Sequence, residues 1–293
     1  MISKLDLYRV FFIVSKEKSF SKAAKELYMT QPSVSMSIMQ LEKDLNTRLF
    51  TRTPKGVILT NEGETLLEHI SSAMNLIDAG EKKLFETQSL IRGELKIGAG
   101  DTISKYFLIP YLEKFHSLFP NINLKIINRT TFELCRLLKL GEIDLAVCNL
   151  PVEDDQIEIK KCMDINDVFV CGEKYKKLTE KKISLLELSM YDLILLESTS
   201  NSRMYVDDFF QKEGIKLKSE IELGSHDLLL EFAKINLGIA CVIKEFASNY
   251  IEEGMLYEVK LKKEIPKRGI GVGYWKKVSL SPAAKKFIEI INV

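Results

Sequence analysis

After residue 93 the chain alternates between short apolar runs, which are typical of β-strands, and stretches with helical spacing. The strand candidates cover residues 95–97, 123–127, 144–148, 167–170, 192–196, 221–223, 239–243, 256–261 and 271–275. This alternation predicts an α/β fold with largely parallel sheets, because parallel strands need long crossover connections that helices supply. Crossings between two groups of strands, near residues 162–166 and 265–269, predict two lobes joined by a hinge.

Charge is distributed unevenly along the chain. The 293 residues are 46% hydrophobic and 28% charged, which predicts a folded protein with more than one domain. The net charge is +1, yet residues 1–60 carry ten basic and five acidic side chains, so the remainder is slightly acidic. A basic head on a faintly acidic body is typical of a nucleic-acid-binding protein.

Targeting and cysteine patterns favour a cytoplasmic protein. No stretch approaches the roughly 18 apolar residues of a membrane helix, so no membrane partner is expected. The first residues lack the pattern of a signal peptide. Five scattered cysteines without a Cys-x-x-Cys pair disfavour a disulfide scaffold and a metal site, so none is predicted. We expect buried, unreactive thiols, with a redox-sensing cysteine as the alternative.

Three helical stretches and a hairpin are predicted within residues 1–60. Ser19 and Ser21 are candidate caps of a second helix, and Thr30 caps a third, with Pro32 in its first turn. The third helix has an inward stripe of Val34, Ile38, Leu41 and Leu45 and an outward face centred on Pro32, Met36, Met39 and Lys43. Two β-prone runs then flank Pro54-Lys55-Gly56. A helix-turn-helix followed by a basic hairpin is a winged helix, whose third helix suits insertion into a DNA major groove.

Five linked motifs in this region carry a family resemblance. They are FSKAAKEL (20–27), QPSVS (31–35), LE (41–42), LFTR (49–52) and LTNEG (59–63). Together they resemble the DNA-binding domain of LysR-type transcriptional regulators. The resemblance implies a DNA-facing set comprising Ser21, Thr30, Gln31, Pro32, Ser33, Ser35, Arg52, Lys55 and Thr60. We also expect Lys22 and Met36 to face DNA. Helix capping is the alternative role for Thr30 and Thr60, and Arg52 has the alternative of pairing with Glu42 or Asp44.

Met36 departs from the family pattern, which usually has arginine or lysine after the position of Ser35. Together with Met39, it places apolar side chains on the outward face of the third helix. Methionine cannot neutralise a phosphate but can contact a thymine methyl group. We therefore expect an A·T-rich site in double-stranded DNA, arranged as an interrupted palindrome.

Residues 61–92 are predicted to form a linker helix for self-association. Ile70, Ile77, Leu84 and Ile91 recur every seven residues, as in the seam of a coiled coil. The resemblance implies that this helix pairs two subunits, giving a homodimer or homotetramer. A helix packed only on its own domain is the alternative.

The motifs of residues 93–293 resemble the effector-binding domain of the same family, whose architecture is that of periplasmic solute-binding proteins. The matching runs are GELKIG (93–98), PYLEKF (110–115), FP (119–120), LGEIDL (140–145) and LGIA (237–240). The chain is thus predicted to comprise a winged helix (1–60), a linker helix (61–92) and this effector-binding domain. We expect lobe I to span about 93–163 and 268–293, and lobe II about 164–267.

Hydroxyl-rich loops after the strands supply the candidate effector site. Its residues are Gly100, Asp101, Thr102, Ile103, Ser104, Thr130, Thr131, Asn149, Ser198, Ser200, Asn201, Ser202, Arg203, Ser225 and His226. Helix starts of this kind favour a small polar metabolite, expected to be anionic, with Arg203, Arg129 and His226 as sources of positive charge. Asp101 and Glu197 oppose a multiply charged anion. Capping or turn formation is the alternative for each residue.

No catalytic constellation is found. The sequence has no Gly-x-Ser-x-Gly elbow, no paired histidines with metal-ligand spacing and no phosphate-binding Gly-Lys-Ser. We predict no enzyme activity and no cofactor other than the effector, and a regulator whose DNA binding the effector modulates. The alternatives are a solute-binding module, an enzyme using Cys148 or His226, and a thiol-sensing regulator.

Overall fold

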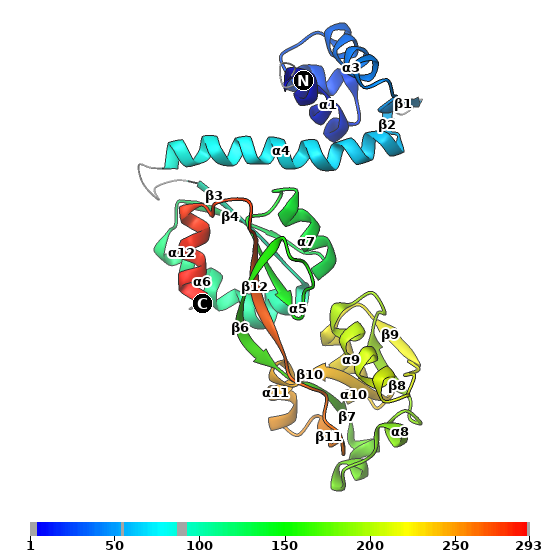
Figure 1. Cartoon of the computed structure of the whole chain (residues 1–293). Coiled ribbons are helices and arrows are strands. Elements are labelled where there is room, and N and C mark those ends of the chain that lie inside the picture. The colour runs from blue at the N-terminus through cyan, green and yellow to red at the C-terminus, as the bar shows by residue number, and fades with distance from the viewer. Residues whose placement is uncertain (1–4, 54–55, 87–92, 292–293) are drawn as a thin grey trace. The chain divides into compact units, whose positions relative to one another are not determined.

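Figure 1 shows the computed structural model of the chain, which describes residues 5–53, 56–86 and 93–291. The chain divides into two compact units. One comprises residues 1–87 with 139–142, and the other comprises residues 88–138 and 143–293.

The first unit begins with three helices and a hairpin, as predicted. Its elements are α1 (Leu5–Glu17), α2 (Phe20–Glu26), α3 (Gln31–Leu45), β1 (Phe50–Thr53), β2 (Gly56–Leu59) and α4 (Asn61–Glu86). Ser19 and Thr30 cap α2 and α3 by accepting hydrogen bonds from Lys22 N and Ser33 N. These local caps explain why the helix starts are readable from sequence.

The core of this unit forms where the inward faces of the three helices meet the hairpin. Val34, Ile38 and Leu41 are almost fully buried against residues of α1, α2 and β2. The prediction for Leu45 is wrong, because its side chain is 38% exposed. The helix ends there, with Asn46 in the left-handed conformation at φ 50°, so the last turn extends beyond the core.

Two close approaches fix the wing and the start of α4. A Cβ on Gly56 would lie 2.5 Å from Lys18 O, and its φ of +134° already favours glycine. A Cβ on Gly63 would lie 2.2 Å from Leu49 O, so α4 begins in direct contact with the segment that leads into β1. Pro54 and Lys55, at the predicted tip, lie outside the described residues.

The surroundings of α4 change along its length. Leu66, Leu67 and Ile70 pack against the core of the first unit, which supports the alternative interpretation for this end of the helix. Farther along, Leu76 and Ile77 are 40% and 42% exposed. The side chain of Leu84 and all of Ile91 fall outside the described part, so the self-association seam stays a prediction.

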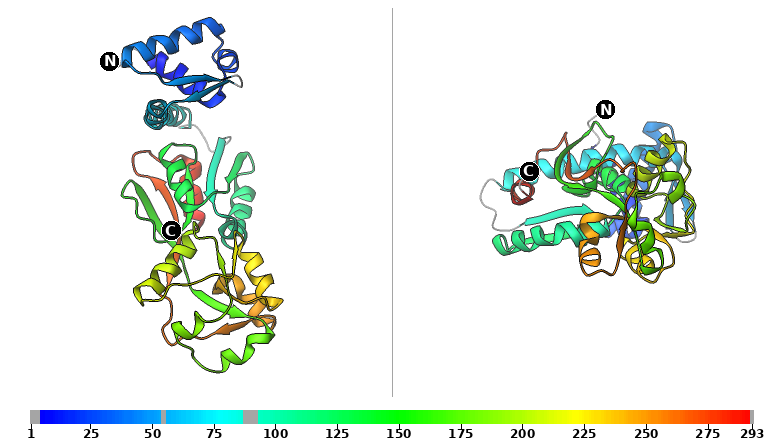
Figure 2. Two further views of the ribbon diagram at one scale, coloured as in Figure 1. Left: turned by 90° about the vertical axis from the view of Figure 1, so that its right-hand side faces the viewer. Right: turned by 90° about the horizontal axis from the view of Figure 1, so that it is seen from below.

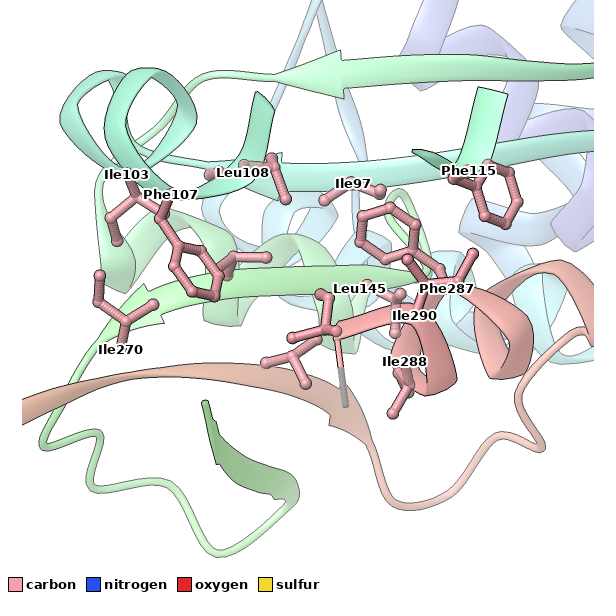
Figure 3. Packing of buried hydrophobic residues seen from close by; sticks show 14 of the residues in the cluster. Ile97, Ile103, Phe107, Leu108, Phe115, Leu145, Ile270, Phe287, Ile288 and Ile290 are labelled. Carbon is pink, nitrogen blue, oxygen red and sulfur yellow. The ribbon is translucent and has the colours of Figure 1, made fainter. Parts of the chain in front are cut away.

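The second unit contains two five-stranded sheets, which we call lobe I and lobe II with their helices. The lobe I sheet has the order β4-β3-β5-β12-β6, formed by β3 (Gly93–Ala99), β4 (Ile122–Ile127), β5 (Leu145–Asn149), β6 (Ile157–Ile165) and β12 (Arg268–Trp275). Its helical segments are α5 (Asp101–Ile103), η2 (Ser104–Leu108), α6 (Ile109–Leu118), α7 (Thr131–Lys139) and α12 (Pro282–Ile291). Figure 3 shows its core, where Phe115 and Phe287 meet residues of the sheet such as Ile97 and Leu145.

The lobe II sheet has the order β11-β7-β10-β8-β9. Its strands are β7 (Asp167–Cys171), β8 (Leu193–Leu196), β9 (Ile221–Leu223), β10 (Ile239–Ile243) and β11 (Tyr257–Val259). The helices are η3 (Glu173–Glu180), α8 (Leu185–Leu188), α9 (Asn201–Lys212), α10 (His226–Lys234) and α11 (Lys244–Glu252). An α/β fold with two sheets is therefore confirmed, whereas the limits predicted for the domains and lobes stay predictions.

The two long strands β6 and β12 connect the lobes. The prediction of largely parallel sheets is wrong, because antiparallel pairs occur in both sheets. β12 pairs antiparallel with both β5 and β6, and β7 pairs antiparallel with β10 and β11. β6 was missed because Lys160 and Lys161 interrupt its apolar alternation. β6 leads directly into β7, while β12 returns beside β6 from lobe II (Figures 1 and 2). Both crossings lie where the sequence predicts them.

Candidate functional sites

The outward face of α3 presents small polar and apolar side chains. Gln31 and Pro32 are exposed, Ser33 and Ser35 are half-buried, and Met36 and Met39 are 66% and 55% exposed. Thr30 Oγ1 accepts from Ser33 N at 3.3 Å and lies 2.7 Å from Ser33 Oγ. This capping pair leaves the first turn of α3 with its polar groups ordered at the surface.

Thr60 acts as a helix cap. Its hydroxyl donates to Arg48 O at 2.7 Å and accepts from Gly63 N at 3.0 Å. Both functions of the hydroxyl are thus engaged within the chain, which supports the capping alternative for this residue.

The other predicted DNA-facing residues differ in what the structure describes. Ser21 and Lys22 are exposed on α2. Glu42, a possible partner of Arg52, accepts from Leu49 N at 2.8 Å and from Phe50 N at 3.2 Å. The side chain of Arg52 and all of Lys55 lie outside the described residues, so their roles stay predictions.

Tyr28 is an exposed residue beside this face that sequence reasoning did not select. It lies between α2 and α3 with φ 54°, and its side chain is 99% exposed. A large aromatic residue in this backbone conformation is uncommon. The sequence signal was the very short connection between the two helices.

A cavity of about 550 Å³ lies at the strand ends in the second unit. Its lining combines residues of both lobes, namely Gly100, Asp101, Thr102, Ile103, Asn128, Arg129, Thr130, Thr131, Glu133, Asn149, Leu196, Glu197, Thr199, Ser200, Asn201, Ser202, Leu223, Gly224, His226 and Ile243. Most of the predicted effector residues are therefore brought together. This grouping follows from the carboxyl ends of strands meeting at one edge of each sheet.

Four predicted effector residues do not line the cavity. Ser104 donates its hydroxyl to the carbonyl of Gly100, the cap residue of α5, at 2.9 Å. Ser198 is an exposed loop residue, and Ser225 occupies the cap position of α10. Arg203 is 7% exposed and does not line the cavity, so its contact with an effector stays a prediction.

The guanidinium of Arg203 is held by groups of lobe II. Its Nε lies 2.9 Å from both carboxylate oxygens of Asp207, and one terminal nitrogen donates to Leu196 O at 2.8 Å and to Glu222 at 3.1 Å. A buried charge of this kind requires such partners. The sequence shows Asp207 one helical turn away but does not show that the side chain turns inward.

His226 also differs from the expected cation. Burial lowers its pKa to about 4, so the ring is neutral near pH 7. Ile243 N donates to Nε2 at 3.0 Å, which places the single ring proton on Nδ1. Among the described residues Nδ1 has no hydrogen-bond partner.

Two family models match the chain. The bacterial regulatory helix-turn-helix protein model of the lysR family covers residues 5–64, and the LysR substrate binding domain model covers residues 88–292. The second match alone spans more than half of the sequence. The chain belongs to the LysR family of transcriptional regulators.

This LysR-family chain is similar to curated regulators along most of its length. It is 28% identical to the HTH-type transcriptional regulator CysL of Bacillus subtilis over 235 residues, covering 80% of this chain and 79% of CysL. It is 25% identical to the RuBisCO operon transcriptional regulator of Allochromatium vinosum, covering 97% of this chain and 93% of that protein. These relatives are transcriptional regulators and not enzymes.

Solved structures share the fold. A full-length OxyR variant from Pseudomonas aeruginosa matches with a TM-score of 0.74 at 20% identity, covering 98% of this chain and 93% of that one. CbnR in complex with its target DNA matches with a TM-score of 0.56 at 20% identity, covering 99% and 98%. Regulators of the LysR family bind DNA, oligomerise and carry an effector-binding domain.

Arg268 is a residue of this LysR-family chain that sequence reasoning missed. It lies at the start of β12, where the chain returns to lobe I, and its side chain is 1% exposed. It donates to Asp167 at 2.8 Å, to Asn149 Oδ1 at 2.8 Å and to Ser202 Oγ at 2.9 Å. Asn149 and Ser202, which we call the cavity floor, line the cavity from different lobes. Arg268 joins both of them to Asp167 at the hinge.

A second contact between the lobes adjoins His226. Asp227 of α10 accepts from Tyr106 Oη and, at 2.8 Å, from Lys105 Nζ, both from η2 of lobe I. Burial and the bond to Asp227 raise the pKa of Tyr106 to about 12. The Tyr106 ring stacks on Phe246 of α11 at 4.9 Å, so the two lobes meet through both polar and aromatic contacts.

Four of the five cysteines lie in surroundings that disfavour the thiolate. The hydrogen bond with Cys135 and burial raise the pKa of the Cys148 thiol. Burial likewise raises the pKa of Cys162 and Cys241, and that of Cys171 to about 11. Since the thiolate is the reactive form, these shifts oppose the thiol-sensing alternative.

Within the described part of the chain, no helix has the length and apolar character needed to span a membrane. Over the same residues, no group of three or more His, Cys, Asp or Glu side chains is placed to hold a metal ion.

Proposed function

We propose that a small polar metabolite with an anionic group binds in the cavity between the lobes and thereby changes how this regulator binds DNA. The observation that carries the proposal is the cavity itself, whose volume of about 550 Å³ suits a small molecule and whose lining comes from both lobes. A ligand that contacts both lobes favours one arrangement of the hinge over others.

The helix starts at the cavity support an anionic group on the ligand. Ser200 and Ser225 occupy the cap positions of α9 and α10, yet neither side chain caps its helix. The first backbone N–H groups of these helices have no acceptor within the helix, so they favour binding of an oxyanion. By contrast, Thr130 and Glu133 close the start of α7 with reciprocal bonds of 3.0 Å and 3.4 Å.

On the DNA side, we propose that α3 enters the major groove with its first turn. Gln31, Ser33 and Ser35 are the residues proposed to contact bases or phosphates, and Met36 is proposed to contact thymine methyl groups. The exposed positions of Gln31 and Met36 support this arrangement. The proposed target is an A·T-rich interrupted palindrome, bound by a dimer or tetramer that assembles through α4.

Thermal unfolding of the full chain tests the effector site. Mixtures of mono- and dicarboxylic metabolites are added to wild type, to Thr102→Val and to the matched control Ser104→Ala. A ligand at about a hundred times its Kd raises the free energy of unfolding of the wild-type protein by about 2.7 kcal/mol. We expect Thr102→Val to lose this gain and Ser104→Ala to keep it, because Ser104 does not line the cavity.

The link to DNA is tested with fragments selected from the host genome by the full chain. The stabilising ligand should change the affinity for, or the footprint on, these fragments in wild type and in Ser104→Ala. A ligand that stabilises the protein but leaves both properties unchanged would contradict the proposed regulation.

A further inference from the structure

The charges that line the cavity do not suit a ligand that is only anionic. Three carboxylates, those of Asp101, Glu133 and Glu197, face one guanidinium, that of Arg129, among the lining residues. His226 adds no charge, since burial lowers its pKa to about 4. The lining is therefore net negative, and an anionic group can bind only where the acidic side chains are distant or matched by a second, positive group.

The three carboxylates differ in their availability. Glu133 accepts from Thr130 N at 3.0 Å and Thr130 Oγ1 at 2.8 Å, and these bonds lower its pKa. Asp101 accepts one bond from Asn128 Nδ2 at 3.2 Å. Glu197 has no hydrogen-bond or ion-pair partner for its carboxylate among the described residues. It lies beside Gly224, whose Cβ position would be 2.8 Å from Glu197 Oε1. Because the Glu197 carboxylate has no partner in the described part of the chain, it is available to accept a hydrogen bond from a donor on a ligand.

The lining also contains hydrogen-bond donors. The start of α9 lacks a side-chain cap, so its first backbone N–H groups are open to an acceptor. His226 is 3% exposed, lines the same cavity and carries a proton on Nδ1 that finds no acceptor among the described residues. A buried donor without a partner is uncommon in folded proteins, and this one indicates an acceptor that arrives with a ligand.

We propose that the effector is a zwitterion of the α-amino acid class. Its carboxylate binds at the start of α9 and at Nδ1–H of His226, and its ammonium group binds Glu197 with support from Asp101. Ile103, Leu196 and Ile243 line the cavity with apolar surface for a small side chain. This inference rests on the proposed role of the cavity as the effector site.

The experiment compares each L-amino acid with its 2-hydroxy acid, which keeps the carboxylate and side chain but replaces the ammonium by a hydroxyl. Thermal unfolding of the full chain identifies the amino acids that bind, and calorimetry gives both dissociation constants. We expect at least one amino acid to bind about tenfold more tightly than its 2-hydroxy acid, which corresponds to about 1.4 kcal/mol.

Glu197→Gln then assigns the difference to one side chain. This variant should weaken amino acid binding about tenfold while leaving the 2-hydroxy acid nearly unchanged. Glu252→Gln is the matched control, because Glu252 is an exposed residue of α11 that does not line the cavity. A loss of both ligands in Glu197→Gln would indicate distortion of the site and would overturn the assignment.

The outcomes separate this inference from the proposed function. Binding of 2-hydroxy acids as tightly as amino acids would overturn the zwitterion and leave a polar anionic effector in place. Binding of neither class would overturn the inference, and the Thr102→Val comparison with other carboxylic metabolites would then decide the proposed function separately.

Discussion

The face of α3 is formed by one continuous segment of the chain, whereas the cavity of the second unit is formed by several distant segments. The α3 face comes from one helix, Gln31–Leu45, whose caps and inward stripe are set by nearby residues. The cavity is lined by segments that range from Gly100 to Ile243, and Arg268 connects its floor to the hinge. We conclude that substitutions on α3 should alter DNA binding with little effect on stability, whereas substitutions around the cavity floor should alter both.

The largest expected effect comes from breaking the buried ion pair at the hinge. Arg268→Met removes the partner of Asp167, whose side chain is only 3% exposed. Leaving a buried carboxylate unpaired should lower the free energy of unfolding by about 3–5 kcal/mol. Chemical denaturation followed by the fluorescence of Trp275 measures this in the second unit alone, because the chain has one tryptophan, in β12.

A double variant controls this prediction. Replacing both partners, as in Arg268→Met with Asp167→Leu, should recover much of the stability, because no buried charge remains unpaired. If Arg268→Met alone leaves the Trp275 transition unchanged, the hinge pair does not hold the cavity floor.

The second prediction concerns pH. The pKa of His226 is about 4 in the folded chain and about 6.5 when unfolded, so the unfolded state binds more protons between these values. Stability from this residue is therefore complete above about pH 6.5 and falls by about 3 kcal/mol as the pH drops to 4. The midpoint of the Trp275 transition, followed from pH 7 to 4, should fall less in His226→Gln than in wild type.

His116→Gln is the matched control, since His116 is exposed on α6. This variant should retain the slope of the wild-type protein. An equal slope in wild type and His226→Gln would show that His226 is not buried in its neutral form.

A smaller effect is expected for the cap of α4. Thr60→Val removes the hydroxyl that accepts from Gly63 N, and loss of such a cap costs about 1 kcal/mol. Far-ultraviolet circular dichroism should show this loss in the first unit, whereas the Trp275 transition should not move. Thr65→Val, an exposed change within the same helix, serves as the comparison. A loss of DNA affinity without any loss of stability would instead assign Thr60 to DNA contact.

The smallest change in stability is expected on the α3 face. Met36→Arg should alter the free energy of unfolding by less than about 0.5 kcal/mol, because the side chain is 66% exposed. It should tighten binding to selected DNA fragments and steepen the slope of log affinity against log salt by about 0.9, the value for one added phosphate contact. Met36→Leu should leave the slope as it is. An unchanged slope in Met36→Arg would indicate that Met36 does not face DNA.

Prediction from sequence succeeded where the determining contacts are local. Ser19 and Thr30 begin their helices as expected, and both crossings between the lobes lie at the predicted segments. It failed for β6, because two lysines interrupt the alternation of apolar residues in that strand. It also failed for Leu45, because the last turn of α3 extends beyond the core. β6 is specified by its pairing with the distant strand β12, and the exposure of Leu45 is set by the extent of the core. Residue spacing encodes neither.

The sequence by itself determined the LysR-type motifs, the capped helices of the first unit and the set of polar loops that follow the strands. Only the tertiary structure decided which of these polar groups are available to a ligand. Arg203 is buried and bonded to the carboxylate of Asp207, and burial keeps His226 neutral. Arg268 pairs with Asp167, which is 101 residues away in the sequence. The physical reason is that charge and hydrogen-bond capacity depend on solvent exposure and on partners from distant segments, and both are set when the two sheets pack around the hinge.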